Sequence, residues 1–202
     1  GSFLQPDTPM TPKNCTGLEH RNITVCFTIN NSNDWLMKGG DIFEGAIQQF
    51  SFEFPELRRK MTIFTAGNSK LIDGSVNMGS MNQANLSAFY RDNVDIYVNT
   101  EPGKKLNGWP LGMEALLQGA VGIQADPHHL SRTEEWNITK ADMFVVPSGK
   151  EGIPQIVSAL AQLIDDTKQL CAMSRRSQQT MFQRLSFENT QAKIFEAMEN
   201  RF

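Results

Sequence analysis

The stretch from Ile23 to Phe50, ITVCFTINNSNDWLMKGGDIFEGAIQQF, decides the fold of this chain. Its first part, Ile23 to Ile29, is a short apolar run of the kind that forms a buried strand. A polar loop follows over residues 30–34. The later apolar residues recur at the spacing of one helix face: Phe43, Ala46, Ile47 and Phe50. The stretch therefore predicts a strand, a loop and a helix in that order.

The same alternation continues along the rest of the chain. Further strands are expected at 61–66, 75–78, 95–99, 121–125 and 143–146, and helices at 82–91, 110–119, 153–164, 166–183 and 187–202. Alternating strands and helices imply a parallel sheet with right-handed crossovers and a helical layer on each face. We therefore expect a Rossmann-like, doubly wound α/β sheet of about six strands with a C-terminal helical tail.

Three parts of the chain differ in composition. Residues 1–20 carry Pro6, Pro9 and Pro12 and begin with a Gly-Ser pair typical of a cloning scar, so we expect a linker there. Residues 21–185 hold the alternating pattern and form the expected nucleotide-sugar-binding domain. Residues 186–202 are expected to form a separate C-terminal helix.

Composition narrows the class of protein. The chain has 202 residues, of which 40% are hydrophobic, as in a globular domain. Its formal net charge of −3 disfavours nucleic acid as a partner, because neutralising phosphates requires a basic surface. No apolar run is long enough to span a bilayer. We therefore expect a cytoplasmic domain, with the inner face of the membrane as an alternative location.

The cysteines and the glycosylation sequons both bear on the cellular compartment. Cys15, Cys26 and Cys171 are far apart, odd in number and without metal-ligand spacing, which favours a reducing compartment. Chance triplets are frequent in a chain rich in Asn, Ser and Thr, so the sequons receive little weight. These sequons are at Asn14, Asn22, Asn85 and Asn137.

Ligands of such a sheet bind beyond the carboxyl ends of the strands, so the loops there hold the candidate residues. Lys38 lies where the first loop enters its helix, beside Gly39 and Gly40. A cation next to free backbone N–H groups at a helix start is suited to bind a diphosphate. The structural alternative is a solvated lysine at a helix start.

Two further positions carry suitable chemistry. Glu114 lies off the apolar stripe of its helix, and a carboxylate accepts two hydroxyl hydrogen bonds, as ribose binding requires. Its structural alternative is a surface glutamate. His128 and His129 follow a strand end and are suited to act as an acid, a base or a diphosphate partner, or else form a polar turn.

The order of these weak motifs resembles a known family. The motifs run Lys38-Gly39-Gly40-Asp41, Gly67, Met78-Gly79, Asp95 to Val98, Gly108-Trp109-Pro110 to Glu114, Gly119 and Ser186-Phe187-Glu188. Together they resemble the C-terminal, donor-binding domain of family-four (glycosyltransferase group 1) enzymes of the GT-B fold. The resemblance covers most of the chain from Ile23 onward. It implies that residues 186–202 pack toward an N-terminal domain absent from this chain.

The resemblance also implies roles for single residues. Lys38 and the backbone of Leu111, Gly112 and Met113 would contact the donor diphosphate, Glu114 the ribose, and Met78 with Gly79 the base. At the position of the family's first glutamate, this chain has Leu106, with Asn107 beside it. The arginine that the family has shortly before its lysine is absent, and the corresponding stretch contains Asn33 and Asp34. Glu101, Asn107 and His128 are candidates for the sugar and phosphate pocket.

The expected activity is sugar transfer from a nucleotide diphosphate donor to a saccharide or lipid-linked acceptor in glycan or polysaccharide biosynthesis. We expect no metal and no cofactor besides the donor substrate. The acceptor would bind through the missing domain, and the full-length protein would be able to associate peripherally with a membrane. One alternative is a noncatalytic interaction domain of the same fold. A phosphoacceptor receiver is disfavoured, because no acidic pair follows the first strand.

Overall fold

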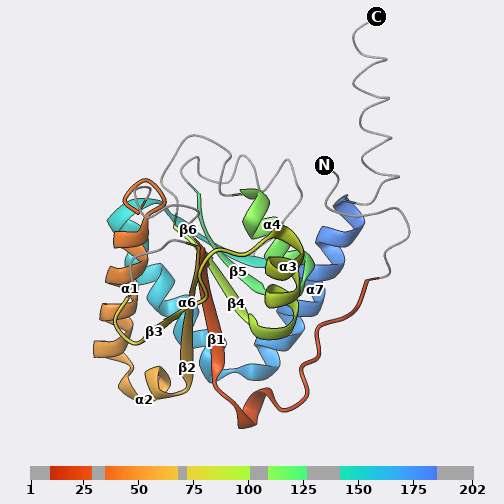
Figure 1. Cartoon of the computed structure of the whole chain (residues 1–202). Helices are drawn as coiled ribbons and strands as arrows, with labels where there is room; N and C mark the ends of the chain where they lie inside the picture. The colour runs from red at the N-terminus through yellow and green to blue at the C-terminus, as the bar shows by residue number, and fades with distance from the viewer. Residues whose placement is uncertain (1–9, 29–34, 68–71, 101–108, 127–141, 186–202) are drawn as a thin grey trace, which may run out of the picture.

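The computed structural model describes residues 10–28, 35–67, 72–100, 109–126 and 142–185. In this part of the chain a parallel six-stranded sheet has the order β3-β2-β1-β4-β5-β6 (Figure 1). The strands are β1 (Ile23–Thr28), β2 (Met61–Ala66), β3 (Ser75–Asn77), β4 (Ile96–Asn99), β5 (Val121–Asp126) and β6 (Met143–Pro147). The predicted doubly wound parallel sheet is confirmed.

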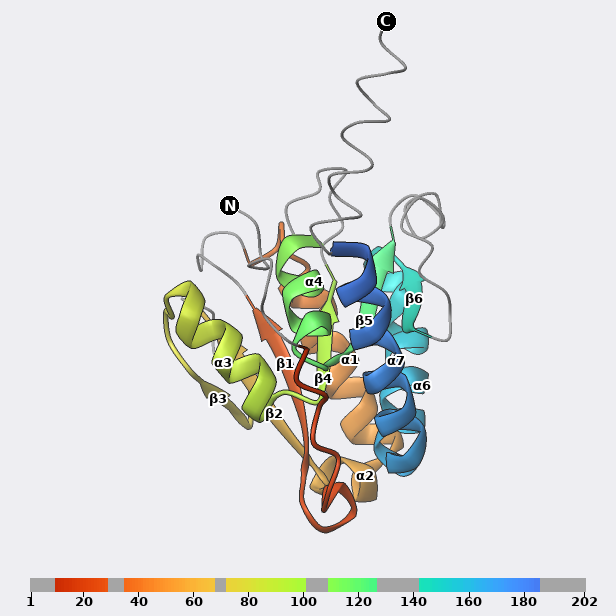
Figure 2. The same ribbon diagram turned by 90° about the vertical axis from the view of Figure 1, so that its right-hand side faces the viewer.

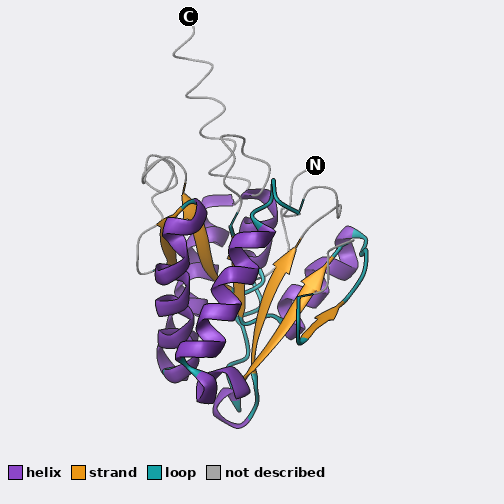
Figure 3. Ribbon diagram, turned by 90° about the vertical axis from the view of Figure 1, so that its left-hand side faces the viewer, coloured by secondary structure: helices purple, strands orange, loops and turns teal. Residues whose placement is uncertain are grey.

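Helices cover both faces of this sheet. They are α1 (Gly40–Glu53), α2 (Pro55–Arg59), α3 (Gln83–Asn93), α4 (Trp109–Leu117), α6 (Ile153–Asp165) and α7 (Thr167–Leu185), with short 3-10 turns at η1 (Leu18–His20) and η4 (Gly149–Gly152). Figure 2 shows α3, α4 and α7 on one face, and Figure 3 shows the opposite side of the molecule. The sheet is therefore the middle layer of three.

Alternation along β1 explains why both faces are apolar. Val25 and Phe27 join the core cluster of α1 and α6, whereas Cys26 joins the cluster of α3 and α4. Successive strand residues point to opposite faces, so a fully apolar run such as this one suits a central parallel strand. The side chains of β1 are buried on both faces of the sheet, since Val25 and Cys26 are each 0% exposed.

The strand order reverses between β1 and β4, and this reversal positions the site. The two strands are hydrogen-bonded neighbours, pairing Val25 with Ile96 and Cys26 with Tyr97. After β1 the chain leads to α1 on one face, and after β4 it leads to α4 on the other face. Neighbouring connections that leave in opposite directions open a crevice at the carboxyl edge, where ligands of this fold bind.

The first twenty residues were expected to be a linker, but their described part packs against the domain. Leu18 is 5% exposed and belongs to the main core cluster. The Lys13 ammonium donates to the carbonyls of Arg91 (2.9 Å) and Val94 (2.8 Å) at the end of α3. The Gln178 amide donates to the carbonyl of Thr11 at 2.9 Å. The domain therefore includes this segment.

Cysteine pairing removes one basis for the expectation of a reducing compartment. Cys15 and Cys171 form a disulfide with a Cα–Cα distance of 5.9 Å, although they are 156 residues apart in sequence. The expectation rested on that wide separation, and this basis is wrong, because α7 returns to lie beside the N-terminal segment (Figure 2). Cys26 is a buried free thiol.

Several helix boundaries agree with the sequence and one expectation lies outside the described residues. Pro55 follows the end of α1 and occupies the first turn of α2. The helix predicted over residues 153–164 forms α6, whose buried face includes Ile156 and Leu160. The predicted helix over 187–202 is not among the described residues. No described helix has the length and apolar character to span a membrane.

Candidate functional site

The start of α1 is held rigidly against the end of β4. Gly39 has a left-handed backbone (φ 71°), and a side chain there would bring its Cβ within 2.1 Å of the Thr100 carbonyl oxygen. The Thr100 hydroxyl donates to the Gly39 carbonyl at 2.6 Å. A Cβ at Gly40 would lie 2.3 Å from the Trp35 ring. Both glycines are therefore required, and they fix the backbone of Lys38 beside the crevice.

The backbone amides beside Lys38 are already in use. The N–H of Gly39 donates to the carbonyl of Leu36 at 3.1 Å, and the N–H of Gly40 donates to that of Trp35 at 2.8 Å. The free N–H groups expected at this helix start are therefore not those of Gly39 and Gly40, because the loop turns tightly enough to satisfy these two itself. The half-buried Lys38 precedes these two glycines, and its contact with a diphosphate remains a prediction.

The turn at Met78 and Gly79 lies against the end of β2. The Met78 N–H donates to the Thr65 carbonyl at 2.8 Å, and the Gly67 N–H donates to the Gly79 carbonyl at 2.7 Å. Gly79 has a left-handed backbone with φ 65°. The predicted base-binding turn therefore lies at the carboxyl edge of the sheet, and the side chain of Met78 is 38% exposed.

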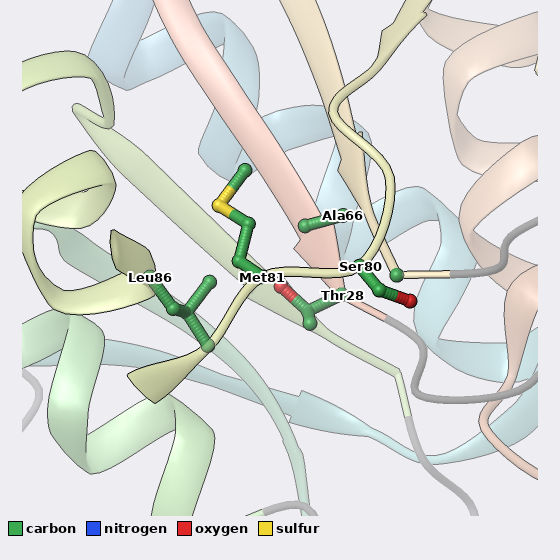
Figure 4. A pocket seen from close by; sticks show the side chains of 6 residues that line it. Thr28, Ala66, Ser80, Met81 and Leu86 are labelled. Atoms are coloured by element: carbon green, nitrogen blue, oxygen red, sulfur yellow. The ribbon is translucent and has the colours of Figure 1, made fainter. Parts of the chain in front are cut away.

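A cavity of about 250 Å³ opens next to this turn (Figure 4). It is lined by Thr28, Ala66, Gly67, Ser80, Met81 and Leu86. The lining includes the two residues that follow the predicted Met78-Gly79 pair, so the turn supports the cavity and the next residues form its wall. Ligand pockets commonly measure about 300–1,000 Å³, so this cavity suits one part of a ligand, such as a base.

One face of α3 connects this cavity with Glu114. Gln83, Leu86 and Tyr90 are three and four positions apart, which places them on the same side of a helix. Leu86 lines the cavity, and the hydroxyls of Tyr90 and Thr28 are hydrogen-bonded at 3.0 Å. The side chain of Gln83 bonds to the carboxylate of Glu114. The cavity and the carboxylate therefore adjoin the same helix face.

Glu114 is a buried residue rather than a surface one. Its exposed fraction is 6%, and burial raises the pKa of its carboxyl, while the hydrogen bond with Gln83 acts in the opposite direction. No ion pair between described residues includes Glu114. The structural alternative of an exposed helix glutamate is therefore wrong. A desolvated carboxylate without a cationic partner forms strong hydrogen bonds to any hydroxyl that reaches it.

The predicted phosphate-binding backbone lies in α4. Leu111 and Gly112 belong to the first turns of this helix. Gly112 is close to β4 and β5, since an added Cβ would lie 3.7 Å from the Tyr97 ring and 3.6 Å from the Gln124 amide oxygen. Met113 packs against the cluster formed by Leu116, Leu117, Met143 and Met181. Contact of these backbone amides with a phosphate remains a prediction.

Lys38 and Glu114 come from helices on opposite faces of the sheet. Both helices follow strands that meet at the β1–β4 reversal. Glu101, Asn107 and His128, with the adjacent His129, lie outside the described residues. Trp35 packs edge-on against Phe27 with ring centroids 6.0 Å apart, so it covers an edge of the core.

Four residues of this region were not predicted from the sequence: Thr28, Gln83, Leu86 and Tyr90. Thr28 was identifiable in principle as a polar residue at the carboxyl end of an apolar strand. The three residues of α3 carried no such signal, because their role depends on how α3 packs beside α4. Groups of three or more His, Cys, Asp or Glu side chains with metal-binding geometry do not occur in the described ranges.

Known structures share this fold. TarM from S. aureus, solved as a variant with UDP among its ligands, has a TM-score of 0.68 and 10% identity over 94% of this chain and 37% of that chain. The pneumococcal O-GlcNAc transferase GtfA with UDP and GlcNAc has a TM-score of 0.64 and 18% identity over 94% and 37%. Anabaena HepE with UDP and glucose has a TM-score of 0.65 and 17% identity over 91% and 50%.

These structures are GT-B glycosyltransferases, and the chain has the fold of a GT-B glycosyltransferase-like domain. It spans between about a third and a half of their length, 37% to 50%. No protein-family model and no curated protein matches its sequence. Identities of 10–18% relate the folds and carry no residue-by-residue assignment.

Proposed function

We propose that this chain is the donor-binding domain of a glycosyltransferase that uses a nucleotide diphosphate sugar. The observation that carries the proposal is the buried carboxylate of Glu114, which adjoins the same α3 face as the cavity beside the Met78-Gly79 turn. A nucleoside presents a flat base and two ribose hydroxyls, and these need an apolar pocket and an acceptor next to it. The GT-B-like fold and neighbours solved with UDP support the same class of ligand.

The diphosphate would lie across the crevice between β1 and β4. Lys38 flanks it from the start of α1, and the first turns of α4 flank it from the other face. Sugar transfer requires stabilisation of the charge that develops on the departing nucleoside diphosphate. The Lys38 ammonium and the amides of Leu111, Gly112 and Met113 would supply it. Leaving-group stabilisation is thus the chemical role that we assign to this half of the enzyme.

The acceptor, a saccharide or a lipid-linked molecule in glycan or polysaccharide biosynthesis, would bind to the N-terminal domain that the resemblance implies. The isolated chain is then expected to bind a nucleoside diphosphate and to transfer no sugar. Family-four membership and peripheral membrane association of the full-length protein remain predictions. The cytoplasmic location expected from the sequence is not part of this proposal, because two of the cysteines on which it rested are paired.

A noncatalytic interaction domain is the second candidate. It is favoured by Leu106 at the position of the family's first glutamate and by the absence of the family's arginine near Asn33 and Asp34. Such a domain would keep the fold without donor binding. The two candidates therefore differ in one measurable property, the affinity for nucleoside diphosphates.

Calorimetric titration with UDP, GDP and ADP tests the proposal. The wild-type chain should bind at least one of them, and Glu114→Gln should bind that ligand more weakly, since a neutral amide accepts a weaker hydrogen bond than a carboxylate. Glu56→Gln is the matched control, because Glu56 is an exposed glutamate paired with Arg59 on α2. Absence of binding by the wild-type chain, or equal affinity of wild type and Glu114→Gln, would overturn the proposal.

A further inference from the structure

The N-terminal segment and α7 are joined by both covalent and hydrogen bonds. Beside the Cys15–Cys171 disulfide, the Gln178 side chain accepts from the Lys13 N–H at 3.1 Å and donates to the Leu117 carbonyl at 2.9 Å. A Cα separation of 5.9 Å lies within the range that a disulfide requires. The packing around the pair therefore holds the two cysteines opposite each other once the chain has folded.

The third cysteine, Cys26, is buried and unpaired. Cys26 lies in β1, is 0% exposed, and burial raises the pKa of its thiol to about 12. Such a thiol is protonated at neutral pH and is unreactive. The odd number of cysteines thus resolves into one linked pair and one inert core residue. A structural disulfide of this kind is typical of proteins that fold in an oxidising compartment.

Two sequon asparagines flank η1: Asn14 precedes it and Asn22 follows it. Asn14 and Asn22 are both exposed. The Asn14 side-chain oxygen accepts from the Thr16 N–H at 2.9 Å, and no described hydrogen bond uses its amide nitrogen. The Asn22 amide donates to the Thr62 hydroxyl at 3.3 Å and retains a second N–H. Both side chains are therefore accessible at the surface of the folded domain.

Both asparagines lie away from the candidate donor site. Asn22 precedes the first residue of β1, so it lies at the amino edge of the sheet, where η1 is also found (Figure 1). Asn14 follows Lys13, whose ammonium bonds to the turn before β4 at the same edge. The candidate cavity lies at the carboxyl edge. Glycans at these two positions would leave the crevice open. Asn85 lies on α3, which borders the cavity, and is not included.

We propose that this chain matures in an oxidising secretory compartment, where it carries N-linked glycans on Asn14 and Asn22 and forms the Cys15–Cys171 disulfide. In glycosylation, the Asn amide nitrogen forms a bond to the anomeric carbon of a polyprenyl-diphosphate oligosaccharide. The bond from that carbon to the diphosphate breaks, the diphosphate leaves and the nitrogen loses a proton. In disulfide formation, the two thiols lose two protons and two electrons to a protein disulfide, which is reduced to a dithiol.

The test is peptide mass spectrometry of the protein purified from its own cells, with thiols alkylated before lysis. Trypsin is expected to cut after Lys13, Arg21 and Lys168, which separates the two sequons and isolates each linked cysteine. The unreduced digest should contain residues 14–21 linked to 169–175. Release of N-glycans by a glycosidase in heavy-oxygen water should convert Asn14 and Asn22 to labelled Asp, while Asn residues outside sequons, such as Asn77, serve as unlabelled controls.

Each result of this mass spectrometry either supports or overturns the proposal. Labelled Asp at both positions together with the linked peptide supports the proposal. Alkylated Cys15 and Cys171 would overturn it, because the protein would then reside in a reducing compartment. A linked peptide with unmodified Asn14 and Asn22 would overturn it as well, because an oxidising compartment without the glycosylation machinery would explain the disulfide alone. Donor binding is independent of each of these results.

Discussion

Two buried carboxylates, Asp95 and Glu114, lie on opposite edges of the same sheet and have contrasting environments. Asp95 is 3% exposed and Glu114 is 6% exposed, so both are removed from water. Asp95 precedes β4 at the amino edge, and Glu114 lies in α4, where it bonds to Gln83 of α3. The two carboxylates differ in the number and charge of the groups that bond to them.

Asp95 is surrounded by donors from its own domain. The Arg21 guanidinium donates two hydrogen bonds to it, both of 2.7 Å. The N–H of Thr24 donates at 2.9 Å and its hydroxyl at 2.8 Å, and the Lys13 ammonium lies 3.9 Å away. These groups satisfy a buried charge and connect the N-terminal segment to β1 and β4. Asp95 is therefore a structural residue.

Glu114 has the opposite character. The group that bonds to it among the described residues is the neutral amide of Gln83, and burial raises the pKa of its carboxyl. Buried carboxylates with few partners are costly for folding and are often retained for binding or catalysis. The difference supports the proposal that the carboxyl edge binds the donor, while the contacts of Asp95 at the amino edge stabilise the fold.

The largest effect is expected from Asp95→Asn. Removal of one partner from a buried ion pair leaves Arg21 and Lys13 without their counter-charge, and this costs about 3–5 kcal/mol of unfolding free energy. Urea denaturation followed by circular dichroism measures the change. Nucleotide affinity should remain at the wild-type value where the variant is folded. A loss below about 1 kcal/mol would mean that Asp95 is not the centre of this network.

A somewhat smaller effect is expected from Cys171→Ser. Removal of the disulfide releases the N-terminal segment from α7 and frees the unfolded chain, which costs about 2–4 kcal/mol. A thermal melt with and without dithiothreitol measures this, since the wild-type chain should lose stability on reduction and the variant should not respond. Equal melting of the oxidised and reduced wild-type chain would show that the hydrogen bonds of Gln178 hold the segment alone.

The sequence predicted much of the fold for a physical reason. Short apolar runs and helical periodicity are local, so β1 and α6 were predicted close to their observed bounds, and α1 was predicted from its apolar face. Burial of Glu114, the partners of Gln83 and the pairing of Cys15 with Cys171 depend on which distant elements pack together. A single sequence carries no local signal for such contacts. The residues of the cavity wall beyond the predicted turn were missed for the same reason.

A modest effect is expected from Tyr90→Phe. The Tyr90 hydroxyl bonds to that of Thr28 at the base of the cavity wall, so its loss removes one neutral hydrogen bond worth about 0.5–1.5 kcal/mol. Chemical denaturation measures the stability, and titration with the bound nucleotide measures the affinity. Phe should preserve the packing of the ring. A change in affinity larger than the change in stability would indicate that the hydroxyl contacts the ligand directly.

The smallest effect is a pH dependence that belongs to Glu114. Its folded pKa is raised above the ordinary value of 4.5, so the native state holds more protons than the unfolded state just above pH 4.5. Its contribution to stability therefore falls as pH rises from 4.5 through the folded pKa and is constant above it. Glu114→Gln should lack this fall. Urea denaturation of both proteins between pH 4 and 8 measures it, and parallel stability curves would contradict the assignment.

Hydrogen exchange with and without UDP, or whichever nucleoside diphosphate binds in calorimetry, tests the central claim most directly. If the carboxyl edge is the donor site, the amides of Gly67, Ser80 and Met81 should exchange more slowly with the nucleotide present, because they border the cavity. The amides of Thr24 and Asp95 at the amino edge should be unchanged. Protection confined to the amino edge, or no protection anywhere at saturating nucleotide, would contradict the account.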